Sequence, residues 1–101
     1  MRYLGDLRGD GILTCGGAEV GRASYEFDGF VSKGGQLSGS GEIRVAPEAL
    51  KKVFGYNDLR LQTDDGQSLS FRFSEKGLQS PGDAAHVDLT GTLPPISKWR
   101  H

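Results

Sequence analysis

The chain has 101 residues, of which 16 are glycine, and its 12 basic and 13 acidic side chains leave a formal net charge of −1. Glycine is therefore well above its average usage of roughly 7%, although the triplet period of collagen is absent. The balanced charge excludes a strongly basic field for sequence-independent nucleic-acid binding. No run of about 18 apolar residues exists to form a transmembrane helix, and the length suits a single domain.

Two features of the sequence predict a cytoplasmic protein. Residues 1–11 carry charges and glycines where a secretory signal needs an apolar core. Cys15 is the only cysteine and cannot form an internal disulfide, which favours a reducing compartment.

The N-terminal segment predicts a first hairpin. Leu7 and Leu13 flank residues 9–11, whose Gly-Asp-Gly composition is typical of a turn. Leu4 and Ile12 fall on the opposite alternation, so the pattern is less regular than in the segments that follow.

Apolar alternation over residues 18–45 predicts a long second hairpin with its turn at 33–35. The cross-strand pairs on its inner face are Val31–Leu37, Gly29–Gly39, Phe27–Gly41 and Tyr25–Ile43. The alternation shifts between Val20 and Tyr25, which predicts a bulge near Gly21. Glycines inside strands mark bends or close backbone approach, so we expect a tightly curved sheet.

Residues 47–54 predict the one helix. Pro47 suits the first helical position, and Gly55 is placed to end the helix. One stripe is apolar and consists of Ala49, Leu50, Val53 and Phe54. Because two turns are not stable alone, this stripe should pack on the sheet and close one end of a barrel or bridge two sheet halves.

Residues 57–74 predict a third hairpin around a three-residue loop, 64–66, with Gly66 in the left-handed region. Its inner pairs are Leu61–Leu69 and Leu59–Phe71. On the outer face this register also sets Asp58 opposite Arg72, a favourable charge pair.

The remaining segments are a loop over 75–83, a last strand over 84–93 and a tail over 94–101. The strand should turn Ala85, Val87, Leu89 and Leu93 inward and His86, Asp88, Thr90 and Thr92 outward. Pro94 and Pro95 end the pairing because neither can donate a ladder hydrogen bond. We therefore expect one β domain, 1–93, followed by the tail.

Together these elements predict an all-β fold, either a small antiparallel barrel or a two-layer sandwich. It should have about seven strands and one short helix, 47–54.

One histidine and one cysteine are candidates for a catalytic role. His86 shares the outward face with Asp88, an arrangement that suits an oriented general base, whereas a surface histidine is the plainer alternative. Cys15 precedes two glycines whose free amides would lower a thiol pKa. The same glycines are ordinary turn residues beside a packed cysteine.

Three carboxylates gather on one outer face, because Glu26 and Asp28 lie near Glu42, with Glu26 directly opposite it. Like charges so placed cost energy. A bound cation, Arg44 or Lys33 would offset the repulsion, as would a different register. We expect no catalytic residue, cofactor site or metal site.

The function that this pattern favours is non-catalytic: a binding or assembly module acting through an exposed strand edge or a glycine-lined groove. Strand 84–93 or the N-terminal hairpin would supply the edge. A homodimer or another protein partner would use it, with no role for a membrane.

Two other functions remain open. The first is an OB-like single-stranded nucleic-acid binder, which the net charge disfavours. Its rings and cations would be Tyr3, Tyr56, Trp99, Arg60, Arg72, Lys51 and Lys52. The second is a small enzyme that uses His86 with Asp88, or the carboxylates of Glu26 and Glu42.

Overall fold

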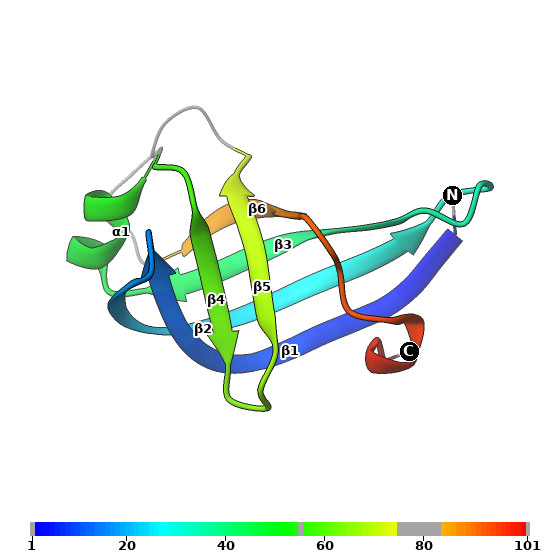
Figure 1. Cartoon of the computed structure of the whole chain (residues 1–101), viewed down its shortest axis with the longest axis horizontal. Helices are drawn as coiled ribbons and strands as arrows, with labels where there is room; N and C mark the ends of the chain where they lie inside the picture. The colour runs from blue at the N-terminus through cyan, green and yellow to red at the C-terminus, as the bar shows by residue number, and fades with distance from the viewer. Residues whose placement is uncertain (1, 55, 75–83, 101) are drawn as a thin grey trace.

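A computed structural model describes residues 2–54, 56–74 and 84–100. Six strands form a closed antiparallel barrel in the order β1-β2-β3-β6-β5-β4, with β4 pairing back to β1 (Figure 1). The strands are β1 Arg2–Cys15, β2 Ala18–Val31, β3 Leu37–Val45, β4 Leu59–Thr63, β5 Ser68–Phe73 and β6 Ala84–Thr90. The helices are α1 Pro47–Val53 and the short 3₁₀ helix η1 Ile96–Lys98. The all-β fold is confirmed, as a barrel with six strands instead of about seven.

The N-terminal segment is one strand, so the hairpin predicted around residues 9–11 is wrong. β1 pairs with β2 over most of its 14 residues, and the chain reverses at Gly16 and Gly17, whose φ angles are 59° and 87°. Gly11 instead allows the backbones of β1 and β4 to lie close together, because a Cβ on Gly11 would lie 2.4 Å from the backbone oxygen of Gln62. Two expected strands are therefore one, which accounts for the smaller number.

The hairpin of β2 and β3 has the predicted register. Phe27 lies opposite Gly41 and Gly29 opposite Gly39. The turn lies at 33–35, since the amide of residue 32 donates to the carbonyl of residue 36.

A bulge between β1 and β2 confirms the predicted shift in alternation. Leu13 is opposite Gly21, whereas Thr14 is opposite Glu19, so Val20 is the extra residue. Bulges of this kind increase strand twist and bend a sheet toward closure.

The hairpin of β4 and β5 also follows the prediction, with Leu59 opposite Phe71 and Leu61 opposite Leu69. Gly66 has a φ of 94° within the three-residue loop, as a turn followed by a left-handed glycine requires.

The predicted pairing of Asp58 with Arg72 is wrong. Asp58 precedes β4 with a φ of 59°, and its carboxylate lies 3.3 Å from Nε of Arg60. The β4–β5 ladder begins at Leu59, so Asp58 lies one position outside it, and on the β6 side Arg72 lies opposite Asp88.

β6 turns Ala85, Val87 and Leu89 into the core as predicted. It ends at Thr90, short of the predicted residue 93, because the next residue, Gly91, takes a φ of 68° that interrupts an extended strand.

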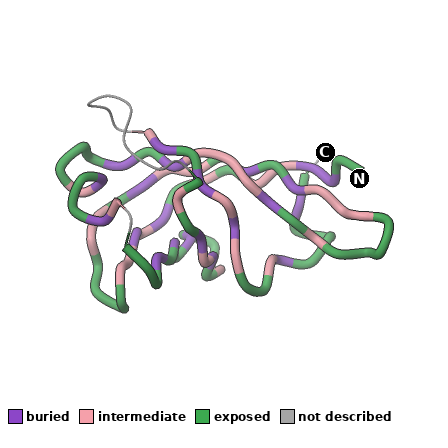
Figure 2. The backbone as a smooth tube through the Cα atoms, turned by 90° about the horizontal axis from the view of Figure 1, so that it is seen from above, coloured by how far each residue is buried: buried purple, intermediate pink, exposed green. Residues whose placement is uncertain are grey.

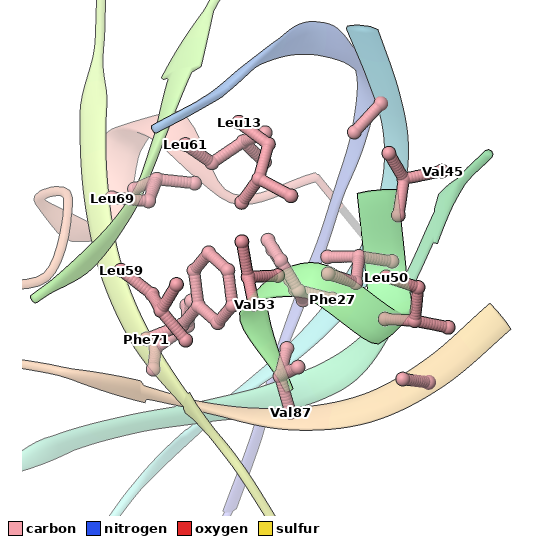
Figure 3. Close-up of a cluster of buried hydrophobic side chains, with 14 of the residues drawn as sticks. Leu13, Phe27, Val45, Leu50, Val53, Leu59, Leu61, Leu69, Phe71 and Val87 are labelled. Atoms are coloured by element: carbon pink, nitrogen blue, oxygen red, sulfur yellow. The ribbon is translucent and has the colours of Figure 1, made fainter. Parts of the chain in front are cut away.

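The core fills the interior of the barrel, and α1 covers one end (Figure 1). Leu50 and Val53 of α1 are buried beside Phe27 and Phe71 (Figure 3). Buried and exposed positions alternate along β4. Figure 2 shows buried and exposed stretches interleaved along the backbone. Gly55 and the loop 75–83, for which predictions were made, lie outside the described residues. Within the part of the chain that is described, no helix has the length and apolar character needed to span a membrane.

β1, β2 and β3 extend beyond the barrel as an arm, defined here as residues 2–5, 29–31 and 37–39 (Figure 1). The tail lies against this arm. Trp99 is 5% exposed, and its indole NH donates to the carbonyl of Pro94 at 3.2 Å. The backbone of Arg100 forms a bridge with Asp6 of β1.

Candidate functional site

The side of β1 that faces away from β2 has lateral partners at two separated places. Residues 11–15 pair with β4, and the carbonyl of Asp10 accepts a hydrogen bond from the amide of Asp64 at 2.9 Å. Nearer the N-terminus, Asp6 exchanges two backbone hydrogen bonds with Arg100. No other described backbone pairs with this side of residues 7–9. We call this stretch the seam gap.

The backbone of Arg8 points into the seam gap. Successive residues of a strand direct their hydrogen-bonding groups to opposite sides. Asp6 and Asp10 both bond on the side away from β2, so Arg8, two residues from each, presents its N–H and C=O on that side. The gap is therefore one pairing position long.

A groove of about 700 Å³ lies over the seam gap. We call it the seam groove. Its lining residues come from β1, β2, the β4–β5 turn and the tail, and are Asp6, Leu7, Arg8, Tyr25, Asp65, Gln67, Ser97, Lys98 and Arg100. Tail residues line one end of the groove and turn residues line the other, and we call these two ends its walls. The unpaired edge of β1 runs between them.

The charges of the two ends differ. At the tail end, the side chains of Lys98 and Arg100 have no ion-pair partner among the described residues. At the turn end, the carboxylate of Asp65 accepts a hydrogen bond from the hydroxyl of Thr63.

Between the two ends, the guanidinium of Arg8 already contacts two carboxylates. Its Nε lies 3.0 Å from a carboxylate oxygen of Asp6 and its Nη2 lies 3.3 Å from Glu26. The tail end therefore carries the two cations Lys98 and Arg100 beside the Asp6 carboxylate that Arg8 contacts, and the turn end carries Asp65.

Tyr25 forms part of the floor of the groove and packs on Gly9, where a Cβ would lie 2.9 Å from the tyrosine hydroxyl oxygen. Burial raises the pKa of Tyr25 above its usual value, with further contributions from Asp65, Asp10 and Asp64. The hydroxyl is thus a neutral hydrogen-bonding group at physiological pH.

The carboxylates predicted to face each other do so: Glu26 lies opposite Glu42. Each has its own arginine. Arg44 lies 3.1 Å from Glu42, whereas Glu26 is contacted by Arg8 of β1. The sequence indicates Arg44 but not Arg8, because the predicted N-terminal hairpin does not pair Arg8 with β2.

Asp28, the third carboxylate, accepts a hydrogen bond from the hydroxyl of Tyr3 at 3.2 Å. In the described ranges, no three His, Cys, Asp or Glu side chains are grouped so as to hold a metal ion. Arginine and tyrosine contacts account for the carboxylates of this face.

His86 has a neighbour that the sequence did not reveal: Oγ of Ser74 lies 2.5 Å from Nδ1 of the ring. The same Oγ lies 3.0 Å from the backbone oxygen of His86. A serine hydroxyl carries one proton, and when it donates to this carbonyl the ring nitrogen is the donor to Oγ. Asp88 lies across the ladder from Arg72. The Ser74–His86 contact therefore ties the end of β5 to β6.

Cys15 is half-buried at the end of β1 and packs against the core. Its thiol lies 3.9 Å from the carbonyl of Asn57. The amide of Gly16, expected to be free near the thiol, donates to the carbonyl of Asp58 at 3.0 Å. The environment is that of a packed cysteine beside a turn.

The aromatic residues expected to form a nucleic-acid platform are dispersed. Trp99 is buried, so its predicted exposure is wrong. Tyr3 and Tyr56 are 48% and 61% exposed, but the start of β1 and the end of α1 lie at opposite ends of the molecule (Figure 1).

The strand edge expected at 84–93 is occupied, because β6 pairs with β3 on one side and β5 on the other. The edges that remain in the described structure include residues 37–39 of β3, which lie beyond the β3–β6 ladder, and the seam gap of β1, within the segment predicted to form the N-terminal hairpin.

Comparisons of the chain with protein-family models, with curated proteins and with solved structures found no match.

Proposed function

We propose that this protein is a non-catalytic binding module that accepts an extended peptide segment of a partner in the seam groove. The observation that supports this most directly is the seam gap, where Arg8 presents a backbone donor and acceptor. An extended peptide that adds to a strand edge pairs with such groups and gains affinity from main-chain hydrogen bonds.

The length of the gap favours selective binding over open-ended strand addition. Long unpaired edges promote aggregation, and proteins commonly cover them. Here Arg100 covers one flank and Asp64 the other. A partner therefore has one pairing position and must enter between two walls, which restricts what fits.

The test is a titration of ¹⁵N-labelled protein with the peptide acetyl-Thr-Val-Thr-Val, which has high strand propensity and no charged side chain. We expect amide shifts confined to residues 7–9 and to the two walls. Shifts elsewhere, or none at millimolar peptide, would contradict the proposal.

The matched variants are Arg8→Pro and Arg8→Ala. Both remove the arginine side chain and its ion pairs, but only proline removes the N–H that points into the groove. Proline is tolerated on strand edges, so both variants should fold. We expect weaker peptide binding in Arg8→Pro than in Arg8→Ala, and equal binding would show that this N–H is not used.

The partner can also be a second copy of the chain. Self-association through this edge stays a prediction, and sedimentation of the wild type beside Arg8→Pro measures it.

A further inference from the structure

We propose that the seam groove captures the C-terminal end of the partner segment, with the terminal carboxylate at Lys98 and Arg100. This inference rests on the proposed function and specifies its ligand. Three observations support it: the limited space along the β1 edge, the direction of its neighbours and the separation of charge in the groove.

The first observation concerns space. A strand paired with Arg8 and continuing toward Asp6 would meet the backbone of Arg100, which already occupies the pairing position at Asp6. A chain that ends there fits without displacing the tail. An internal segment would have to bend away from the edge within one or two residues.

The second observation concerns direction. β4 and the Arg100 bridge are both antiparallel to β1. A segment with the same sense runs from the turn end of the groove, near Asp65, toward the tail end. Its C-terminus is then the end that reaches Lys98 and Arg100, which line that part of the groove.

The third observation concerns charge. Lys98 and Arg100 have no carboxylate partner within the described ranges, whereas Arg8 already contacts Asp6 and Glu26. Hydrogen bonds between such cations and a carboxylate are roughly twice as strong as neutral ones. Asp65 at the other end repels a carboxylate and so disfavours the reversed orientation.

The decisive experiment compares two forms of one peptide, acetyl-Thr-Val-Thr-Val with a free C-terminal acid and with a C-terminal amide. Both can form the same main-chain bonds, and they differ in the terminal charge. We expect the amide to bind about tenfold more weakly. A third peptide, amidated but with glutamate as its last residue, separates a terminal from a side-chain carboxylate; we expect it to bind like the plain amide.

The variants Lys98→Gln and Arg100→Gln test the two cations. We expect each variant to bind the free-acid peptide more weakly, with an affinity close to that of the amidated peptide. Binding of the amidated peptide should not change. Lys51→Gln and Lys52→Gln, on the exposed face of α1, remove the same charge elsewhere and should leave the acid–amide difference intact.

The outcomes separate this inference from the proposed function. The free-acid peptide and the amidated peptide can shift the backbone NH signals of residues 7–9 equally. In that case the groove binds extended peptides but does not select the terminus, and the inference is overturned. Equal binding of the glutamate peptide and the free acid also overturns it. If neither form perturbs the groove, the proposed function fails as well.

Discussion

The indole of Trp99 occupies the space that a side chain at Gly29 would take: a Cβ on Gly29 would lie 2.6 Å from Cε3 of the ring. Gly39, its cross-strand partner, is also covered, with its Cβ position 3.1 Å from Cη2. A Cβ on Gly5 would lie 2.2 Å from the backbone oxygen of Arg100. Three glycines of the arm thus make room for the tail, which forms one wall of the seam groove.

Replacing Gly29 with alanine should displace Trp99. The added methyl meets a ring that is packed on the sheet, and overpacking of this kind costs about 1–3 kcal/mol. Urea unfolding should show that loss, and the emission of the single tryptophan should shift to the red as the ring gains solvent. Gly21→Ala is the control, since nothing lies within 4 Å of its Cβ position. A Gly29→Ala protein as stable as Gly21→Ala would contradict the packing.

Trp99→Ala should loosen the tail bridge and reduce stability. Truncating a buried tryptophan costs about 3–5 kcal/mol, and without this anchor the amides of Asp6 and Arg100 should exchange faster with solvent. Hydrogen exchange at the β1–β4 ladder serves as an internal reference. Ile96→Ala, at a tail position that is 55% exposed, should change little by comparison.

Leu61→Ala should lower the free energy of unfolding more than most single substitutions in the barrel. Leu61 is fully buried, and its truncation removes buried area and leaves a cavity, at a cost of about 2–5 kcal/mol. Chemical denaturation measures this. Tyr56→Ala, at an exposed position, should stay within about 0.5 kcal/mol of the wild type. Similar losses in both variants would show that the interior is not packed as described.

The pair of Arg22 and Asp64 should contribute stability that depends on pH. Two hydrogen bonds of 2.8 Å join them, and the guanidinium lowers the pKa of Asp64 below its usual value. The contribution of the pair to the free energy of unfolding is therefore fully present above the pKa of Asp64 in the unfolded chain, about 4. It is lost as the pH falls through the pKa of Asp64 in the folded protein. Both side chains are exposed, so solvent screens the effect and it is small.

NMR titration of the Asp64 carboxyl carbon checks this directly. In Arg22→Gln the pKa should return toward the usual value. The difference in urea midpoint between this variant and the wild type should disappear at pH values below the folded pKa of Asp64 that the titration gives. A difference that persists there would assign the effect to something other than the ion pair.

Much of the barrel was predictable because side-chain alternation sets register once two strands and their turn are known. The pairs Leu61–Leu69 and Phe27–Gly41 followed from this rule. The rule fails where a glycine is ambiguous. Gly9 and Gly11 resemble turn residues, yet they sit inside β1, where Tyr25 and the β4 backbone come close.

The candidate site was only partly predictable for a related reason. The sequence predicted a glycine-lined groove, whereas the residues that line the seam groove include no glycine and come from segments that meet only in the folded chain. Arg8 reaches Glu26 across the ladder, and Lys98 belongs to a tail with no periodic pattern. Ser74 beside His86 depended on β5–β6 pairing, which local alternation does not specify.

The closure of the barrel has a consequence for how the chain folds. β1 finds its second neighbour only when β4 is present, and the pairs that join them, such as Gly11 with Thr63, are far apart in sequence. Such long-range pairing raises contact order and slows folding to the millisecond-to-second range. The hairpins of β2–β3 and β4–β5, whose contacts are local, should therefore form before the ring closes, and the first strand should be among the last to gain all its partners.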